Sequence, residues 1–202
     1  MKSLIIIDFQ FDFCNPKGSL YVKGAEEAKK GILEYMEKNH KSFNQIIYTL
    51  DWHLDKDESF KKNGGLWPDH CVQKSKGAKI DDELYKKLKQ YNKSETLFKK
   101  GTVHTHEEYG AFEKFKNENK NNKKDISNCT FYNFNMDSTA KIINNNIVVC
   151  GIAGDYCVME SIKNLLKHWK FNLEVLVRGV ASIDDGSKLK SFMKDNKLAA
   201  AN

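Results

Sequence analysis

The feature that most constrains the fold is a regular alternation of short apolar runs with longer segments whose apolar residues recur at helical spacing. The apolar runs predict strands at residues 4–8, 45–50, 95–99, 146–152 and 173–177. The periodic segments predict helices at 24–39, 81–91, 155–169 and 184–196, and a segment at 107–119 that begins as a helix. Elements that alternate in this way indicate an α/β fold with a parallel sheet.

Chain length and composition indicate one domain. A chain of 202 residues suits a single hydrophobic core, so we expect one domain over residues 1–202. The segment at about 117–146 is rich in Asn and Lys and is interpreted as a surface insertion. Its Cys129, Phe131, Tyr132 and Phe134 are apolar enough to predict that part of the insertion packs against the domain.

The charge pattern and the cysteine content limit the binding partners and the cellular compartment that we expect. The net charge of +6 comes from lysines beside acids or asparagines, without a basic stripe interleaved with aromatic residues, so no nucleic-acid partner is expected. No apolar run reaches the roughly 18 residues of a membrane span, and the apolar run at the start is too short for a signal peptide. Five cysteines without a C-x-x-C pair suit a reducing compartment. We therefore expect a cytoplasmic protein without a membrane partner.

Several reactive side chains follow predicted strands. Ligands of parallel sheets bind beyond the carboxyl ends of the strands, so Asp8, Asp51, Lys99-Lys100 and the segment after Ile152 are expected to converge. A lysine beside a cysteine and an aspartate can hold a thiolate by charge. The alternative for Lys100 is a solvated surface lysine, and Lys99 is an equal candidate for the role beside the cysteine. Asp8 could instead be a strand-end acid that binds backbone N–H groups.

Cys157 follows a turn of small residues at the start of a predicted helix. Free N–H groups and the positive end of the helix dipole lower the pKa of a thiol in such a place. Backbone N–H groups of the same turn can also face an oxyanion. The pattern predicts a nucleophile, with a buried structural cysteine as the alternative. Cys150 lies inside the predicted strand and is expected to be a core residue.

A second pattern predicts a metal site. Asp51 and His53 stand in Asp-Trp-His, and His70 follows in Trp-Pro-Asp-His-Cys. One carboxylate and two imidazoles with open coordination positions suit Zn, Mn or Fe. The alternative is that Asp51 caps a turn while both histidines lie on the surface.

Together these motifs resemble the nicotinamidase/pyrazinamidase branch of the isochorismatase-like hydrolases. The resemblance covers nearly the whole chain apart from the insertion, and it rests on Asp8-Phe9-Gln10-Phe11-Asp12-Phe13, Asp51-Trp52-His53, Ser59-Phe60, Trp67-Pro68-Asp69-His70-Cys71, Gly77-Ala78, Lys100-Gly101, Tyr109-Gly110-Ala111-Phe112 and residues 151–158. It implies a three-layer α/β/α fold around a parallel sheet of six strands.

The resemblance also implies a role for individual residues. The implied catalytic triad is Asp8, Lys100 and Cys157, and one divalent metal ion, zinc ahead of manganese or iron, is implied on Asp51, His53 and His70. It further implies a cis peptide bond between Ile152 and Ala153, an oxyanion hole from the N–H groups of Ala153 and Cys157, and substrate contacts from Phe13, Trp67, Tyr109 and Ile152. Ser59 stands where some relatives have a further histidine ligand, and Glu58 is another candidate for the metal shell.

The activity implied by the resemblance is hydrolysis of nicotinamide to nicotinate and ammonia through a cysteine thioester, as in NAD salvage. Pyrazinamide is an expected second substrate, because it differs by one ring atom. The alternative is a related cysteine amidase that acts on another small amide or carbamoyl compound. A binding protein without activity is a third interpretation, against which the retained Asp8, Lys100 and Cys157 count. The sequence is compatible with a homo-oligomer.

Overall fold

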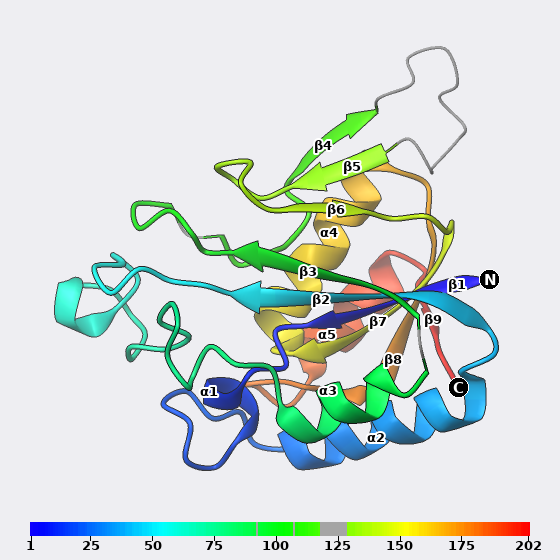
Figure 1. Ribbon diagram of the computed structural model, residues 1–202, viewed down its shortest axis with the longest axis horizontal. Coiled ribbons are helices and arrows are strands. Elements are labelled where there is room, and N and C mark those ends of the chain that lie inside the picture. Colours follow the sequence, from blue (N-terminus) through cyan, green and yellow to red (C-terminus); the bar gives the residue numbers. More distant parts are fainter. Residues whose placement is uncertain (92, 107, 118–128) are drawn as a thin grey trace.

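The computed structural model describes residues 1–91, 93–106, 108–117 and 129–202 (Figure 1). Its main sheet has six parallel strands in the order β3-β2-β1-β7-β8-β9. Their bounds are β1 Lys2–Ile7, β2 Phe43–Asp51, β3 Ser94–Lys100, β7 Asn146–Ile152, β8 Asn172–Ala181 and β9 Ala199–Ala200. The expected sheet of six parallel strands is confirmed. The two-residue strand β9 was not predicted, because so short a strand leaves no pattern in the sequence.

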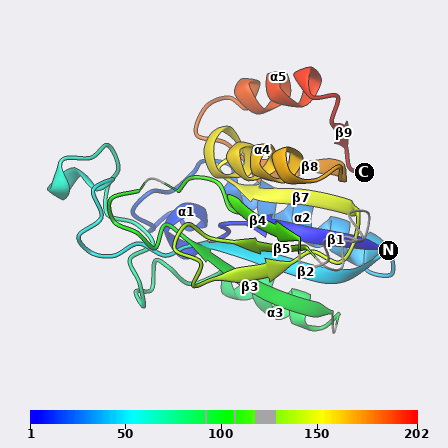
Figure 2. The same ribbon diagram turned by 90° about the horizontal axis from the view of Figure 1, so that it is seen from above.

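Helices cover both faces of the main sheet (Figures 1 and 2). They are α1 Phe11–Cys14, α2 Ala25–Asn39, α3 Asp82–Lys89, α4 Met159–His168 and α5 Ser187–Asp195. The predicted helix at 155–169 starts with a single π-helical turn, η3 (Gly154–Val158), and a 3-10 turn, η1, spans Lys61–Asn63. Asp81 caps α3 with its carboxylate, which accepts the Leu84 N–H at 2.9 Å.

Two hydrophobic cores lie on opposite sides of the sheet. Leu4 and Ile6 of β1 pack with α2 and α3, whereas Ile5 and Ile7 pack with α4 and α5. Because successive side chains of a strand point to opposite faces, both faces of β1 are buried. This explains why β1 is a continuous apolar run, and it confirms the three-layer architecture.

The insertion and the residues just before it form a second sheet of three antiparallel strands, β4 Lys114–Asn117, β5 Cys129–Tyr132 and β6 Thr139–Lys141. The helix predicted at 107–119 is therefore wrong in the described residues, because 114–117 pair with β5 as a strand. Residues 107 and 118–128 lie outside the described part of the chain. The cause of the error is long-range pairing, since β4 acquires its partner only where Phe115 meets Phe131.

The described residues of the insertion are partly buried. Phe131 is fully buried, with its ring 5.5 Å from that of Phe112 and 5.1 Å from that of Phe115. Ala140 and Ile142 join the same core, on the face that carries α4. The expectation that part of the insertion packs against the domain is confirmed.

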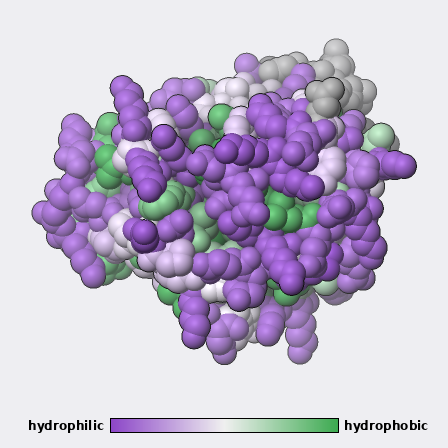
Figure 3. Space-filling view, turned by 60° about the horizontal axis from the view of Figure 1, so that its bottom comes forward, coloured by the Kyte–Doolittle hydropathy of each residue, from purple (hydrophilic) through white to green (hydrophobic). Residues whose placement is uncertain are grey.

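The outer surface is mostly polar. Hydrophilic side chains cover most of the face shown in Figure 3, and apolar ones are scattered among them. Among the described residues, no helix combines the length and the apolar character that a membrane span needs.

We expect Phe131→Ala to lower the free energy of unfolding by about 3–5 kcal/mol, because it leaves a cavity among packed rings. Urea unfolding followed by circular dichroism measures the change. Met136→Ala is the control in the same segment, because Met136 is 57% exposed and its truncation should change stability by less than about 0.5 kcal/mol. Equal destabilisation by both substitutions would contradict the burial of Phe131.

Candidate active site

Reactive side chains gather at the carboxyl edge of the main sheet, where the arrowheads of β2 and β3 end in Figure 1. Asp8 directly follows β1, Asp51 ends β2, Lys100 ends β3, and Cys157 lies in η3 after β7. The chain proceeds from β1 toward β3 on one side and from β7 toward β9 on the other. The boundary between β1 and β7 is thus a topological switch point, where open α/β sheets bind ligands.

Lys100 is the centre of this cluster. Its ammonium lies 2.9 Å from Asp8 Oδ2, 2.7 Å from Asp51 Oδ1 and 3.6 Å from Cys157 Sγ. Burial lowers the pKa of Lys100, but Asp51 and Asp8 raise it more, so the group stays charged. Of the two candidate lysines, only Lys100 faces the cluster, because Lys99 lies 4.3 Å above the ring of Trp52.

Asp8 is held by the neighbouring strand. The Thr49 hydroxyl donates to Asp8 Oδ1 at 2.6 Å, and the Asp8 N–H donates to Thr49 Oγ1 at 3.1 Å. The φ of Asp8 is 44°, in the left-handed region that non-glycine residues seldom adopt and that concentrates at functional sites. Burial raises the pKa of Asp8, Lys100 lowers it and Asp51 raises it, with a net increase. The carboxylate is therefore a stronger proton acceptor than an exposed aspartate.

The Cys157 thiol is buried at the base of the cluster. Burial raises its pKa well above the ordinary value, Lys100 lowers it, and Asp8 and Asp51 raise it again. The expectation that the start of a helix lowers this pKa is wrong, because the thiol is only 7% exposed and lies beside two carboxylates. The thiol consequently keeps its proton until a base removes it.

Asp51, His53 and His70 form a second cluster, in which one ligand atom of each lies within 4.8 Å of the others. His53 Nε2 lies 3.4 Å from Asp51 Oδ1, and His70 Nε2 lies 3.8 Å from Asp51 Oδ2. The other ring nitrogens are held from behind, His53 Nδ1 by Asp57 Oδ2 at 2.9 Å and His70 Nδ1 by the Pro68 carbonyl at 2.8 Å. Such contacts orient the rings in metal sites.

This donor set fits a divalent metal ion, because two imidazoles and one carboxylate leave open positions around the ion. Burial raises the pKa of Asp51, but Lys100 and His53 lower it far more, so Asp51 is ionised. Burial lowers the pKa of His53, whereas Asp51 raises it to about 10, so the cluster attracts a positive charge. Glu58 is exposed and lies outside the group of three that the described residues form.

A cavity of about 30 Å³ lies beside Cys157 and His70. Its apolar walls are Phe13, Leu20, Val22, Trp67, Tyr156 and Ile183. Phe13 and Trp67 were expected there, whereas Tyr109 stands behind Trp67 and accepts its indole N–H at 3.0 Å. Ile152 is fully buried in β7, and the implied cis peptide bond between Ile152 and Ala153 is confirmed.

Comparison with known proteins decides the family of the chain. The family model of the isochorismatase domain matches residues 2–200. The chain belongs to the isochorismatase family. It is 29% identical over 183 residues to the nicotinamidase of Saccharomyces cerevisiae, with 78% of each chain covered.

Two solved structures resemble this isochorismatase-family chain over all of its length. PnC1 from L. infantum in complex with nicotinate is 30% identical, with a TM-score of 0.78 and 92% of that chain covered. The pyrazinamidase of Pyrococcus horikoshii in complex with zinc is 25% identical, with a TM-score of 0.72 and 98% of that chain covered. The isochorismatase-like fold is thereby confirmed.

Sequence reasoning missed the side chains that hold the backbone of this isochorismatase-family site. Gln10 is fully buried and donates to the carbonyls of Asp51 at 2.8 Å and Ala78 at 3.0 Å, while its Oε1 accepts the Asp51 N–H at 2.8 Å. Thr49 also bonds to the N–H and the carboxylate of Asp8, and Asp57 contacts the ring of His53 at Nδ1. Gln10 stands inside a matching motif, but its residue type does not reveal which strand it will contact.

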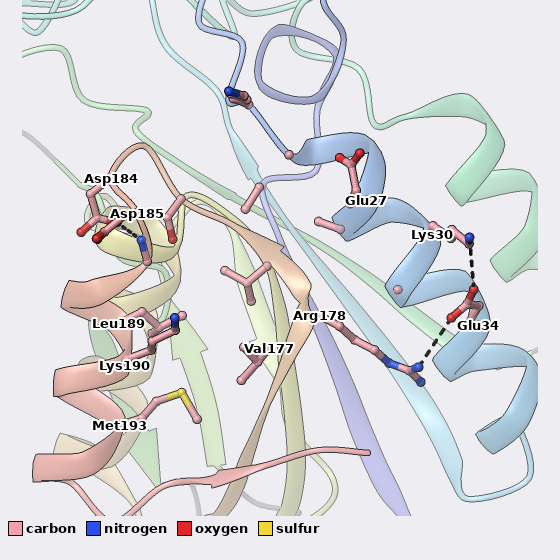
Figure 4. A pocket seen from close by; sticks show the side chains of 18 residues that line it. Glu27, Lys30, Glu34, Val177, Arg178, Asp184, Asp185, Leu189, Lys190 and Met193 are labelled. Atoms are coloured by element: carbon pink, nitrogen blue, oxygen red, sulfur yellow. Dashed lines mark hydrogen bonds and ion pairs between the residues drawn. The ribbon is translucent and has the colours of Figure 1, made fainter.

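A larger hollow of about 620 Å³ lies between α2 and α5, beside β8 (Figure 4). Its walls carry an ion-pair chain in which Glu34 lies 4.0 Å from Lys30 and 3.5 Å from Arg178. None of the nucleophilic or metal-ligating side chains above lines this hollow. We therefore place the chemistry of this family member in the smaller cavity.

Gly101 provides a test of the metal cluster. A Cβ at Gly101 would lie 2.7 Å from His53 Cε1 and 3.2 Å from Asp51 Oδ1, at a φ of +65°. We expect Gly101→Ala to displace the His53 ring and to weaken the binding of a divalent metal ion, with zinc as the probe, by about 10–100-fold, as when a ligand loses its support. Isothermal titration calorimetry of the metal-free protein measures this affinity.

Gly64→Ala is the matched control, because Gly64 has a φ of +95° but nothing within 4 Å of the added carbon. It imposes backbone strain without the contact to His53. Equal zinc affinity in the two variants would contradict the placement of Gly101 against the ligands.

Proposed function

We propose that this chain is a nicotinamidase, which hydrolyses nicotinamide to nicotinate and ammonia, and that zinc is the metal held by Asp51, His53 and His70. The observation that carries the proposal is the buried Lys100 ammonium, which contacts Asp8, Asp51 and Cys157 together. The relatives support it, since one is a nicotinamidase, a second is in complex with nicotinate and a third, a pyrazinamidase, is in complex with zinc.

In this proposal Asp8 is the general base. Its Oδ2 forms an ion pair with Lys100 but accepts no hydrogen bond of good geometry within the described residues, so lone pairs remain for a proton. A carboxylate oxygen of Asp8 lies within 4.8 Å of Cys157 Sγ. Asp8 takes the thiol proton as Sγ attacks the carboxamide carbon, and the nearby Lys100 stabilises the thiolate by charge.

The attack moves negative charge onto the carboxamide oxygen. The backbone N–H groups of Ala153 and Cys157 are the proposed donors to this oxyanion. Asp8 then gives its proton to the departing nitrogen, and the C–N bond breaks. Ammonia departs, and the acyl group remains bound to Cys157 as a thioester. Water attacks the thioester while Asp8 takes one proton from the water. The C–S bond then breaks, Asp8 returns that proton to Cys157 Sγ, and the carboxylic acid leaves and ionises to nicotinate.

The substrate ring is placed by the other cluster. A metal ion held by Asp51, His53 and His70 would supply a coordination position for the ring nitrogen of a pyridine or pyrazine carboxamide. Phe13 and Trp67 would flank the ring.

Ammonia release from nicotinamide, before and after chelation and re-addition of zinc, manganese or iron, tests the proposal. We expect release to fall on chelation and to return with metal. Cys157→Ala should lose nearly all activity, because the nucleophile is gone. Cys150→Ala is the matched control, because Cys150 is a buried core thiol whose Sγ lies 3.7 Å from the Ile5 carbonyl.

Wild-type turnover by Cys157→Ala would refute the mechanism. Folded, metal-loaded protein that releases no ammonia from nicotinamide would instead indicate an amidase for another small amide or carbamoyl compound.

A further inference from the structure

The connection between β5 and β6 is fastened to the catalytic end of β3. The Lys99 N–H donates to Ser138 Oγ at 2.8 Å. Asn133, which is fully buried, donates to Thr102 Oγ1 at 3.1 Å. The insertion therefore contacts the chain on both sides of Lys100.

Glu108 is the buried acid at the centre of this junction, and the mechanism above does not use it. Its carboxylate Oε2 accepts the Gly101 N–H at 2.8 Å, and Oε1 accepts the Phe134 N–H at 2.8 Å. Its own carbonyl accepts from Lys100 Nζ at 3.3 Å. Glu108 is only 3% exposed, so each of these contacts replaces one with water.

We propose that Glu108 is a positioning residue, whose ionised carboxylate joins the β5–β6 connection to Gly101 and so holds the Lys100 ammonium against Asp8 and Cys157. The inference rests on the proposed function, because its kinetic test uses nicotinamide as the substrate. By this inference the insertion takes part in catalysis, because it holds the end of β3 in place.

The chemistry of the junction requires the ionised form. Both partners of the carboxylate are N–H donors, so both of its oxygens must accept. A protonated carboxyl, like a glutamine amide, has only one oxygen that accepts freely, and it leaves one buried N–H without a partner. Lower pH and Glu108→Gln should therefore loosen the junction in the same way.

Burial and the charges around Glu108 place the protonation of its carboxylate near neutral pH. Burial raises the pKa of Glu108 to about 7, against the N–H groups of Gly101 and Phe134 and the charge of Lys100, which lower it. Glu113 raises it further. The β5–β6 connection, residues 133–138, contributes one charged group, the exposed Asp137. Because the competent form is ionised, activity should fall as pH decreases through about 7.

The test measures kcat and KM for nicotinamide across the neutral pH range in the metal-loaded protein. We expect Glu108→Gln to lose the acidic limb of the kcat profile near pH 7 and to have a kcat about tenfold lower at higher pH, since small displacements of a catalytic group are costly. KM should stay within about twofold of the wild-type value, because the expected fault lies in the reacting geometry.

Two further variants complete the design. Asp137→Asn is the matched control, because it removes an exposed carboxylate charge from the same connection but keeps an amide oxygen that can still accept from Asn133 Nδ2. It should behave as wild type. Glu108→Asp keeps the charge with a shorter reach, so it should retain an acidic limb at a shifted pH. It carries the test if Glu108→Gln does not fold.

Alkylation of Cys157 by iodoacetamide, followed by peptide mass spectrometry, provides a readout that does not depend on the substrate. Lys100 near Sγ favours the thiolate, so Glu108→Gln should be alkylated several-fold more slowly than wild type. If the wild-type protein releases no ammonia from nicotinamide, the proposed function fails and the alkylation rates still decide the role of Glu108. Rates and pH limbs that neither Glu108→Gln nor Glu108→Asp changes would overturn the inference.

Discussion

The buried ammonium of Lys100 sets the conditions that the rest of the active site has to meet. A lysine charge removed from water is stable only where opposite charges and hydrogen bonds compensate for the lost hydration. Asp8 and Asp51 provide that compensation, and each comes from the end of a different strand. The adjacency of β1, β2 and β3 in the sheet is therefore an electrostatic requirement of the site as well as a packing result.

The same ion pairs connect the two clusters. Asp51 contacts Lys100 on one side and both histidines on the other, so one carboxylate belongs to the reacting group and to the metal group. Gln10 fixes the backbone of Asp51 at both its N–H and its carbonyl. The position of Lys100 relative to the two histidines is set in this way by the end of β2.

The strand pattern of the sequence was sufficient to predict the main sheet, because buried parallel strands are continuous apolar runs with few alternatives. It failed at β4, because Lys114-Phe115-Lys116 becomes a strand only through its pairing with Phe131. The convergence of Asp8, Asp51 and Lys100 could be predicted from their places at strand ends, whereas the roles proposed for the site residues rest on the family resemblance. The direction of the Cys157 pKa shift could not be predicted, because it is set by burial and by neighbouring carboxylates that only the folded chain brings together.

By itself, the sequence determined the fold class, the family resemblance and the residues that stand at the carboxyl ends of the strands. Those properties depend on local periodicity and on short motifs. Only the tertiary structure decided which of Lys99 and Lys100 faces Cys157, which groups hold Asp8 and His53, and that Glu108 joins the insertion to the end of β3. Each of these features is either a contact between elements distant in the chain or the face of a strand to which a side chain points. The energies of such contacts depend on burial, which no local sequence pattern specifies.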